Sequence, residues 1–410
     1  MRFKVHLLKG DKMITYLIMF VFTAIFLVLA KESYVKYKKY KYCQVYHEVA
    51  SDNTQSSKPL KVYKVYANVS PKKRKKYIKK FHKNYLVFFI AAILVIGLVS
   101  GLRSVNVGTD LSYTYFPNFN KILKGDLTVY TEKGFTYFNK FLQQFSSNPQ
   151  ILTLSTSFIF AFTLCFVSIK YSKSPILSVI VACLSTAYFI SLNNVRQSIA
   201  CIIMIAAYPS LYKKQLLKFL LFVLIGCIFH YSVLIFIPVY MFINWRWIKK
   251  RFLSIAIILT VSLPVLTKGL LLLISKTKYN YFLVSDFNNG NANKLNIIFG
   301  LVWFVIAFII LYKDRMKHRQ SWTLLALQFF SFWTSLLSLF ISVSEMISRL
   351  TNFFIFYQIL IIPYLVSMQK KKSRKILIIC LYLITYGLYM YYYIIMKGYH
   401  AVLPFEWCFK

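Results

Sequence analysis

The chain has 410 residues, of which 58% are hydrophobic, and it carries 51 Lys and Arg residues against 11 Asp and Glu residues. A soluble basic protein would not be this apolar. Continuous apolar runs such as 13–30 and 376–396 are long enough, or nearly so, to cross a bilayer. We therefore expect an all-α, polytopic integral membrane protein. A β-barrel is not expected, because the runs are continuous rather than alternating.

Basic residues divide the connections between these runs into two alternating sets. The apolar runs predict about 12 transmembrane helices, at 13–30, 85–101, 151–169, 176–191, 197–212, 216–230, 231–245, 252–274, 296–312, 322–342, 350–368 and 376–396. One set of connections holds 34 of the 51 Lys and Arg residues: 31–84, 170–175, 213–218, 246–251, 313–319 and 370–375. Positively charged connections remain in the cytoplasm. We therefore expect both termini outside, and the net charge of +40 reflects topology rather than binding to nucleic acid.

This topology defines three regions. Residues 1–30 are expected to form a first transmembrane helix with an external N-terminus, because no small-residue cleavage site follows the apolar run. Residues 31–84, rich in Lys and Tyr, are expected to be a basic cytoplasmic loop that is disordered or lies on the anionic inner leaflet. Residues 85–410 form the membrane-embedded core. Its outer loop 102–150 predicts short helices in the outer leaflet interface, and 276–295 is a second outer loop containing "NNGNAN".

The stretch "SLNNVRQSIA" places polar residues inside a long apolar segment, where they are costly and usually functional. Basic connections on both sides require an even number of crossings, which places Arg196 at an outer turn. An arginine that snorkels to the headgroups is the alternative, but the neighbouring Asn193, Asn194 and Gln197 favour a packed polar site. A forked, permanently charged guanidinium suits phosphate or pyrophosphate.

The same argument from an even number of membrane crossings between basic connections predicts two further outer turns. One contains His230, and the other contains Glu345 and Arg349. Histidine titrates near neutral pH, as a general acid or base must, although a hydrogen-bonded histidine at a helix end is an equal alternative. Arg349 could instead be an ordinary residue at the boundary of a span, where it would pair with Glu345. The outer loop adds three charged candidates, which could equally be surface residues or interface anchors: Arg103, Asp110 and Glu132.

The sequence contains no nucleotide-binding signature, no CxxC pair and no metal-ligating cluster, so neither a metal nor a cofactor is expected. An enzyme at this face would have to draw its energy from the substrate. A lipid-linked pyrophosphate sugar provides that energy. Arginines would stabilise the leaving pyrophosphate, and a carboxylate or histidine would take the proton from the attacking hydroxyl.

Six segments in chain order carry a family resemblance: "GLRSVNVGTDLSYTYF", "TEKGFTYFNKFL", "SLNNVRQSIA", "FHYSVLIFIPVY", "ISRLTNFFIFYQILIIPYL" and "GYHAVLPFEW". They are similar to the EpsG family of bacterial exopolysaccharide polymerases, which looks like the Wzy class. The Arg-x4-Gly-x-Asp spacing at 103–110 and the Asn-x-x-Arg-Gln-x-x-Ala block at 193–200 are the most specific parts. The resemblance covers 85–410 and excludes the basic loop.

The resemblance implies a glycosyltransferase that polymerises undecaprenyl-pyrophosphate-linked oligosaccharide repeat units at the outer face of the bacterial cytoplasmic membrane, for exopolysaccharide or capsule. Its motifs mark as site candidates Arg103, Gly108, Asp110, Glu132, Arg196, Gln197, His230 and Arg349. We expect one of Asp110, Glu132 and His230 to be the base, and the three arginines to bind pyrophosphate. Asn193, Glu345, Gly108 and Gln197 would support them. The expected partners are the lipid-linked substrate, the bilayer and other polysaccharide-export proteins.

Three rival functions remain at this point. A flippase for lipid-linked oligosaccharides should carry polar residues through the full depth of a cavity, whereas here they lie at outer turns. A single-sugar GT-C-type transferase or a ligase would differ from a polymerase in the length of its products. A membrane O-acyltransferase would use a histidine but would leave several arginines unexplained.

Overall fold

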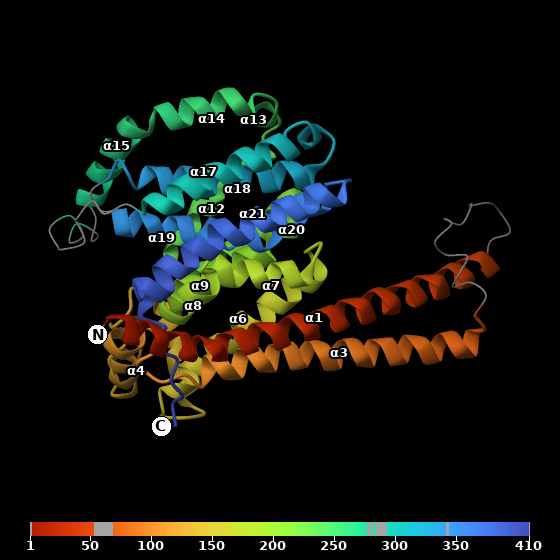
Figure 1. The fold of residues 1–410 in the computed structure, drawn as a ribbon, viewed down its shortest axis with the longest axis horizontal. Coiled ribbons are helices and arrows are strands. Elements are labelled where there is room, and N and C mark those ends of the chain that lie inside the picture. Colours follow the sequence, from red (N-terminus) through yellow and green to blue (C-terminus); the bar gives the residue numbers. More distant parts are fainter. Residues whose placement is uncertain are drawn as a thin grey trace.

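The computed structural model describes residues 2–52, 69–276, 280, 283, 293–341 and 344–409 (Figure 1). Every regular element in these ranges is helical, and one β-bridge pairs Arg103 with Trp407. The expected all-α class is therefore confirmed. Most of the predicted outer loop 276–295 lies outside the described residues. Within that loop, Asn293 caps the next helix by accepting a hydrogen bond from the Asn296 amide at 3.0 Å.

Two long N-terminal helices, α1 (Arg2–Asp52) and α3 (Pro71–Gly101), form an antiparallel hairpin that projects from the helical body (Figure 1). Helix α1, with 51 residues, measures about 75 Å, which is more than twice the hydrocarbon thickness of a bilayer. The expectation of disorder at 31–84 is wrong over 31–52 and 71–84, where the chain is helical, and the cytoplasmic position of this segment stays a prediction.

Aromatic rings pair along the projecting part of this hairpin. The ring centroids of Tyr34 and Tyr85 lie 5.2 Å apart, and those of Tyr40 and Phe81 lie 5.8 Å apart. Tyr37 packs on His82 at 4.9 Å. Ring pairs of this kind stabilise two basic helices whose sequence has no ordinary apolar stripe, which explains why periodicity alone misses them.

The outer loop contains three short helices, as predicted: η1 (Leu111–Tyr115), α4 (Phe116–Leu123) and α5 (Lys133–Gln143). They pack with the start of α9 around a small apolar core of their own, separate from the main core. The body consists of α6 (Gln150–Lys170), α7 (Pro175–Leu184), α8 (Ala187–Asn193), α9 (Val195–Ala206), α10 (Tyr208–Tyr212), α11 (Leu216–Phe229), η2 (Tyr231–Ile235), α12 (Phe236–Asn244), α13 (Arg246–Lys250), α14 (Phe252–Val261), α15 (Leu263–Ser275), α17 (Lys294–Leu311), η4 (Asp314–Met316), α18 (Arg319–Leu337), α19 (Ser344–Ile355), α20 (Gln358–Ser367), α21 (Lys372–Met390), η5 (Tyr391–Met396) and η6 (Tyr399–Ala401).

Six helical segments in the described part of the chain are long and apolar enough to cross a membrane, or up to eight if each of two bent pairs is one span. The predicted count of about 12 is not confirmed. Several predicted spans are short or broken: α7 and α8 meet at 57°, and α14 and α15 meet at 60°. Thr186 has a φ of 63° at the first bend. Pro264, at the start of α15, lacks the amide proton that would continue α14 through the second.

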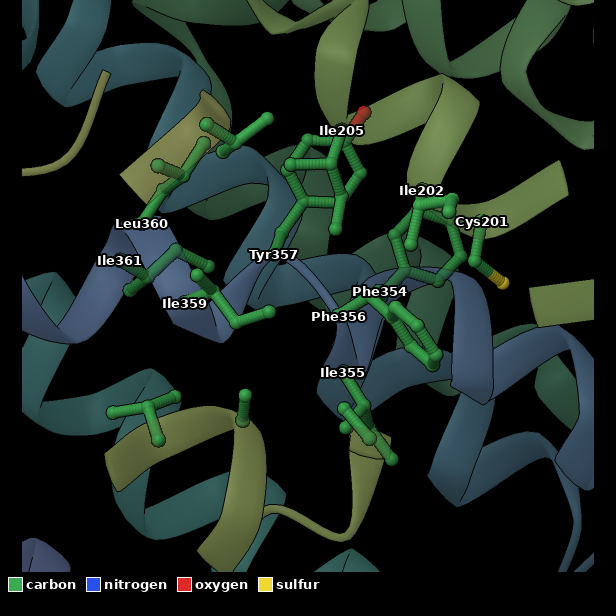
Figure 2. Close-up of a cluster of buried hydrophobic side chains, with 14 of the residues drawn as sticks. Cys201, Ile202, Ile205, Phe354, Ile355, Phe356, Tyr357, Ile359, Leu360 and Ile361 are labelled. Carbon is green, nitrogen blue, oxygen red and sulfur yellow. The ribbon is translucent and has the colours of Figure 1, made fainter. Parts of the chain in front are cut away.

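Part of the main core lies between α9 and the segment 354–361 (Figure 2). Tyr357, Ile359 and Leu360 contribute buried side chains from α20 and the turn before it, and Cys201 and Ile205 contribute them from α9. The span that contains α20 is 78% buried, against 33% for the first span. The central helix therefore contacts protein on most sides, and α1 keeps an apolar face for lipid.

The C-terminal tail returns to the N-terminal hairpin. The Ser104 amide donates to the Glu406 carbonyl and the Cys408 amide donates to the Leu102 carbonyl, both at 2.8 Å. The Tyr16 hydroxyl donates to the Val402 carbonyl at 3.0 Å. These hydrogen bonds join the tail to α1 and to the end of α3.

Two glycines offer a paired test of the helix packing. A Cβ at Gly101 would lie 2.9 Å from Leu154 Cα on α6, whereas a Cβ at Gly387 would meet nothing within 4 Å. Gly101→Ala should therefore destabilise the fold by about 1–3 kcal/mol. Gly387→Ala should leave stability unchanged or raise it by up to about 1 kcal/mol. Thermal unfolding of the purified proteins checks this, and equal shifts of the same sign would contradict the packing of α3 on α6.

Candidate active site

Glu132 connects three separate segments of the chain. Its buried carboxylate accepts a hydrogen bond from Arg196 Nη1 at 2.5 Å and pairs with His230 Nδ1 at 3.1 Å. Glu132 immediately precedes α5, Arg196 lies in the first turn of α9, and His230 lies between α11 and η2. The outer loop and two of the predicted outer turns thus meet at one carboxylate.

Interruptions in the helices place the side chains of Arg196 and His230. Asn194 has φ −82° and ψ 60°, which ends α8 and starts α9 one residue before Arg196. His230 is extended, with φ −160° and ψ 119°, so α11 ends and η2 begins at the imidazole. The polar residues at 193–197 and at 230 therefore lie at helix ends, as the sequence predicts, and not in the middle of a span.

The charges at Glu132 balance each other. Burial raises the pKa of the Glu132 carboxyl, but hydrogen bonding to His230 and the positive charge of Arg196 more than offset this and lower it to about 2. Glu132 is therefore ionised at neutral pH. The Arg196 guanidinium carbon lies 4.9 Å from the Tyr130 ring centroid, and the Arg196 amide donates to the Tyr115 hydroxyl at 3.3 Å. The buried Arg196 Nε has no hydrogen-bond partner among the residues that the structure describes.

A second polar cluster surrounds Asn193. Its Oδ1 accepts a hydrogen bond from the Asp110 amide at 2.8 Å, and its Nδ2 lies 3.1 Å from His400 Nδ1. The Gly108 amide donates to the Ala401 carbonyl at 3.0 Å. Gly108 has a φ of 101°, and a Cβ there would lie 2.7 Å from the Leu192 carbonyl oxygen. Only glycine fits this approach of the outer loop to α8.

Gln197 joins α9 to α19. Its Nε2 donates to the Arg349 carbonyl at 2.5 Å, and its Oε1 accepts from Asn352 Nδ2 at 3.4 Å. The middle of α19, which carries Arg349, is thereby held beside Gln197 at the start of α9. The side chain of Glu345, predicted to support this turn, lies outside the described residues.

Arg103 lies apart from the accessible charges, although it is predicted to bind pyrophosphate. Its side chain is 1% exposed. The guanidinium donates to the carbonyls of Ser100, Val107 and Leu192 and to the Ser157 hydroxyl. Burial lowers the pKa of Arg103 to about 10, so it stays protonated at neutral pH. In this arrangement its donors are occupied by the protein.

His400 is a site residue that the sequence reasoning missed. It has a φ of 66°, and its neighbours Gly398 and Ala401 have φ values of 63° and 48°. Left-handed backbone at a non-glycine residue is uncommon and clusters at functional sites. Burial and the charge of Arg349 lower the pKa of His400 to about 4. The sequence signal for His400 is the tail segment "GYHAVLPFEW", which is one of the six segments that carry the resemblance.

The structure thus brings together Glu132, Arg196 and His230 by direct contact, and attaches Asn193, Gln197 and Arg349 to the same helix ends. Asp110 contacts Asn193 through its main-chain amide, and Gly108 allows the outer loop to approach Leu192 at the end of α8. Within the described ranges, no three His, Cys, Asp or Glu residues group as metal ligands would.

These features define a multi-pass, all-helical membrane protein with an Arg–Glu–His cluster at the ends of its helices. The EpsG family model matches residues 85–407. The chain belongs to the EpsG family, which indicates an exopolysaccharide polymerase-type role. Searches of curated proteins and of solved structures gave no match. Both the Glu132 and the Asn193 clusters lie within the matched residues.

Replacing Glu132 by Gln should lower the free energy of unfolding at pH 7 by about 2 kcal/mol or more, because Arg196 loses its counter-charge. The stability that the ionised carboxylate contributes is complete above its ordinary pKa of 4.5 and is lost as pH falls through about 2. The difference between wild type and E132Q should therefore shrink over that range. Thermal unfolding at several pH values measures it, with Glu32→Gln on exposed α1 as control. A difference independent of pH would contradict the ion pair.

Proposed function

We propose that this protein is an exopolysaccharide polymerase that joins undecaprenyl-pyrophosphate-linked oligosaccharide repeat units at the outer face of the bacterial cytoplasmic membrane. The observation that carries the proposal is the contact of one buried carboxylate, Glu132, with both Arg196 and His230. A permanent cation and a proton acceptor next to each other are what transfer from a sugar pyrophosphate requires.

The reaction exchanges one bond for another. A hydroxyl oxygen of the acceptor sugar attacks the anomeric carbon of the donor chain, and the bond from that carbon to the pyrophosphate oxygen breaks. Undecaprenyl pyrophosphate leaves with the electron pair of that bond, and the hydroxyl proton passes to a base on the protein. The energy comes from the pyrophosphate leaving group, so no nucleotide is consumed.

Among the three predicted bases, His230 fits best. Glu132 has a pKa of about 2 and already accepts hydrogen bonds from two partners, so it is a weak base at neutral pH. Asp110 enters the Asn193 cluster through its main-chain amide. Glu132 at Nδ1 orients the imidazole of His230 and leaves Nε2 for the hydroxyl proton, as a carboxylate does in other carboxylate–imidazole pairs.

Arg196 and Arg349 are the proposed pyrophosphate ligands. A guanidinium has five N–H donors, and Glu132 occupies only part of those of Arg196. Arg349 is attached to the same helix through Gln197, and its charge reaches His400. Two cations on neighbouring helices suit a pyrophosphate better than a neutral leaving group.

Arg103 takes a different role in this proposal. Its donors are spent on carbonyls at the end of α3, in the outer loop and at the end of α8. We assign it to positioning: it holds the outer loop against α8, so that Gly108 and Asn193 meet. The polar residues around Gly108 and Asn193 lie near the start of α9. The basic residue Lys213 follows α10, at the opposite end. Because basic residues mark the cytoplasmic side, this arrangement supports an outward-facing site.

The decisive experiment is an assay with purified protein and a defined undecaprenyl-pyrophosphate repeat unit. Wild type should produce a ladder of products on a gel. Arg196→Ala should reduce the rate about 100-fold or more, because leaving-group charge is no longer stabilised. Arg251→Ala, at an exposed arginine outside this site, should retain the ladder. A ladder of wild-type rate and length from Arg196→Ala would overturn the role of Arg196.

The same assay separates the rival functions. Products one sugar longer would indicate a single-sugar transferase, and transfer of a finished chain to an acceptor would indicate a ligase. Movement of unchanged substrate across a vesicle membrane, without any ladder, would indicate a flippase.

His230→Ala should lower kcat by about 100-fold to 10,000-fold, the usual contribution of a general base. KM for the lipid-linked donor should change little, because in this scheme His230 contacts the acceptor hydroxyl and not the pyrophosphate. Steady-state kinetics with donor and acceptor varied separately checks this. A rise in donor KM with unchanged kcat would show that His230 binds substrate instead.

A further inference from the structure

A pocket of about 380 Å³ opens at the end of the body that carries the basic connections. Its lining comes from the end of α10, the start of α18 and the last turns of α20: Tyr212, Lys213, His318, Arg319, Gln320 and Tyr364. Helices α9 and α10 separate it from Arg196 by about 25 Å of helix. The pocket is therefore remote from the Glu132 cluster.

Positive charge surrounds this pocket. Lys213 and Arg319 line it, and Lys173 Nζ lies 5.8 Å from the centroid of the Tyr364 ring in its wall. Lys249 is close enough to feel Arg319 and Lys214, and its pKa is lowered by burial and by these charges. The cations come from connections that lie far apart in the sequence.

Little negative charge from carboxylates offsets the positive charge at this pocket. None of the six lining residues is acidic. The nearby Asp314 carboxylate accepts a hydrogen bond from the Ser321 hydroxyl and lies 3.6 Å from His318 Nε2. Ser321 also hydrogen-bonds the Tyr364 hydroxyl at 2.9 Å. Asp314 is thus engaged by neighbouring side chains, and the lining residues Lys213 and Arg319 keep their positive charge.

Hydrogen bonds and a cation–ring contact hold together the connections beside the pocket. Arg315 donates from Nε to the Lys249 carbonyl at 3.2 Å, and its guanidinium lies 3.4 Å from the Tyr312 ring centroid. This links the connection at 246–251 to η4. Tyr364 is buried, so its ring forms an aromatic wall. Like charges held together on a rigid frame destabilise the fold unless an anion lies between them.

We propose that this pocket binds a phosphate-bearing anion on the face opposite the Glu132 cluster. Arginine and lysine side chains recognise phosphoryl oxygens. The volume exceeds that of a lone phosphate and falls in the range of small-molecule sites. It accommodates a phosphoryl group with an attached polar group against the tyrosine walls. That phosphoryl group belongs either to an anionic phospholipid headgroup or to a soluble phosphorylated molecule.

The test uses the full-length protein in a zwitterionic detergent. The probes are phosphatidylglycerol, with phosphatidylcholine as its neutral counterpart, and ATP, with adenosine as its counterpart. The compared proteins are wild type, Lys213→Gln/Arg319→Gln, and the control Lys79→Gln/Lys80→Gln. The control removes the same charge from exposed positions on α3. Binding is followed by the shift in Tm and by bound mass in native mass spectrometry.

Wild type and control should bind one of the two anionic probes, and the pocket variant should bind it about tenfold more weakly or worse, as expected for lost charged hydrogen bonds. Phosphatidylglycerol alone would identify a lipid headgroup site, and ATP alone a soluble ligand. Equal binding by the pocket variant and the control, or no preference for either anion over its neutral counterpart, would overturn the proposal. The single variant Arg319→Gln replaces the double variant if the latter does not fold.

Discussion

The buried guanidinium of Arg103 is the interaction on which the outer half of the structure depends. A charge removed from water must be surrounded by acceptors, and Arg103 finds them on the end of α3, the outer loop, α6 and α8. Satisfying this one group fixes the mutual position of those elements. The tight approach at Gly108 and the return of the tail over the outer loop are built on that arrangement.

Glu132 is a second buried charge, and basic side chains rather than carbonyls surround it. Its negative charge is buried between a permanent cation, Arg196, and a titratable ring, His230. The hydrogen bond with His230 and the charge of Arg196 lower the pKa of the carboxyl, so the carboxylate is a poor proton acceptor at neutral pH. One acidic side chain thereby joins three residues from distant parts of the chain into one hydrogen-bonded network.

The two ends of the helical body differ in their charge balance. At the end that carries the Glu132 cluster, arginines are matched by a carboxylate, by carbonyls and by polar side chains. At the other end, lysines and arginines accumulate with little acidic compensation, around a rigid, tyrosine-walled pocket. The predicted cytoplasmic position would explain why such residues are there, but it would not explain why four connections converge on one cavity.

The sequence by itself determined the helical class, the membrane environment, the short helices of the outer loop and the chain breaks at Arg196 and His230. These follow from local properties, namely apolar length, charge bias and the cost of polar residues in apolar segments. Only the tertiary structure decided the rest. Span number depends on bends such as that at Thr186, and the hairpin of α1 and α3 depends on rings that meet between helices. Whether an arginine is buried, as Arg103 is, or paired, as Arg196 is, depends on partners about 50 to 90 residues away, which no local pattern encodes.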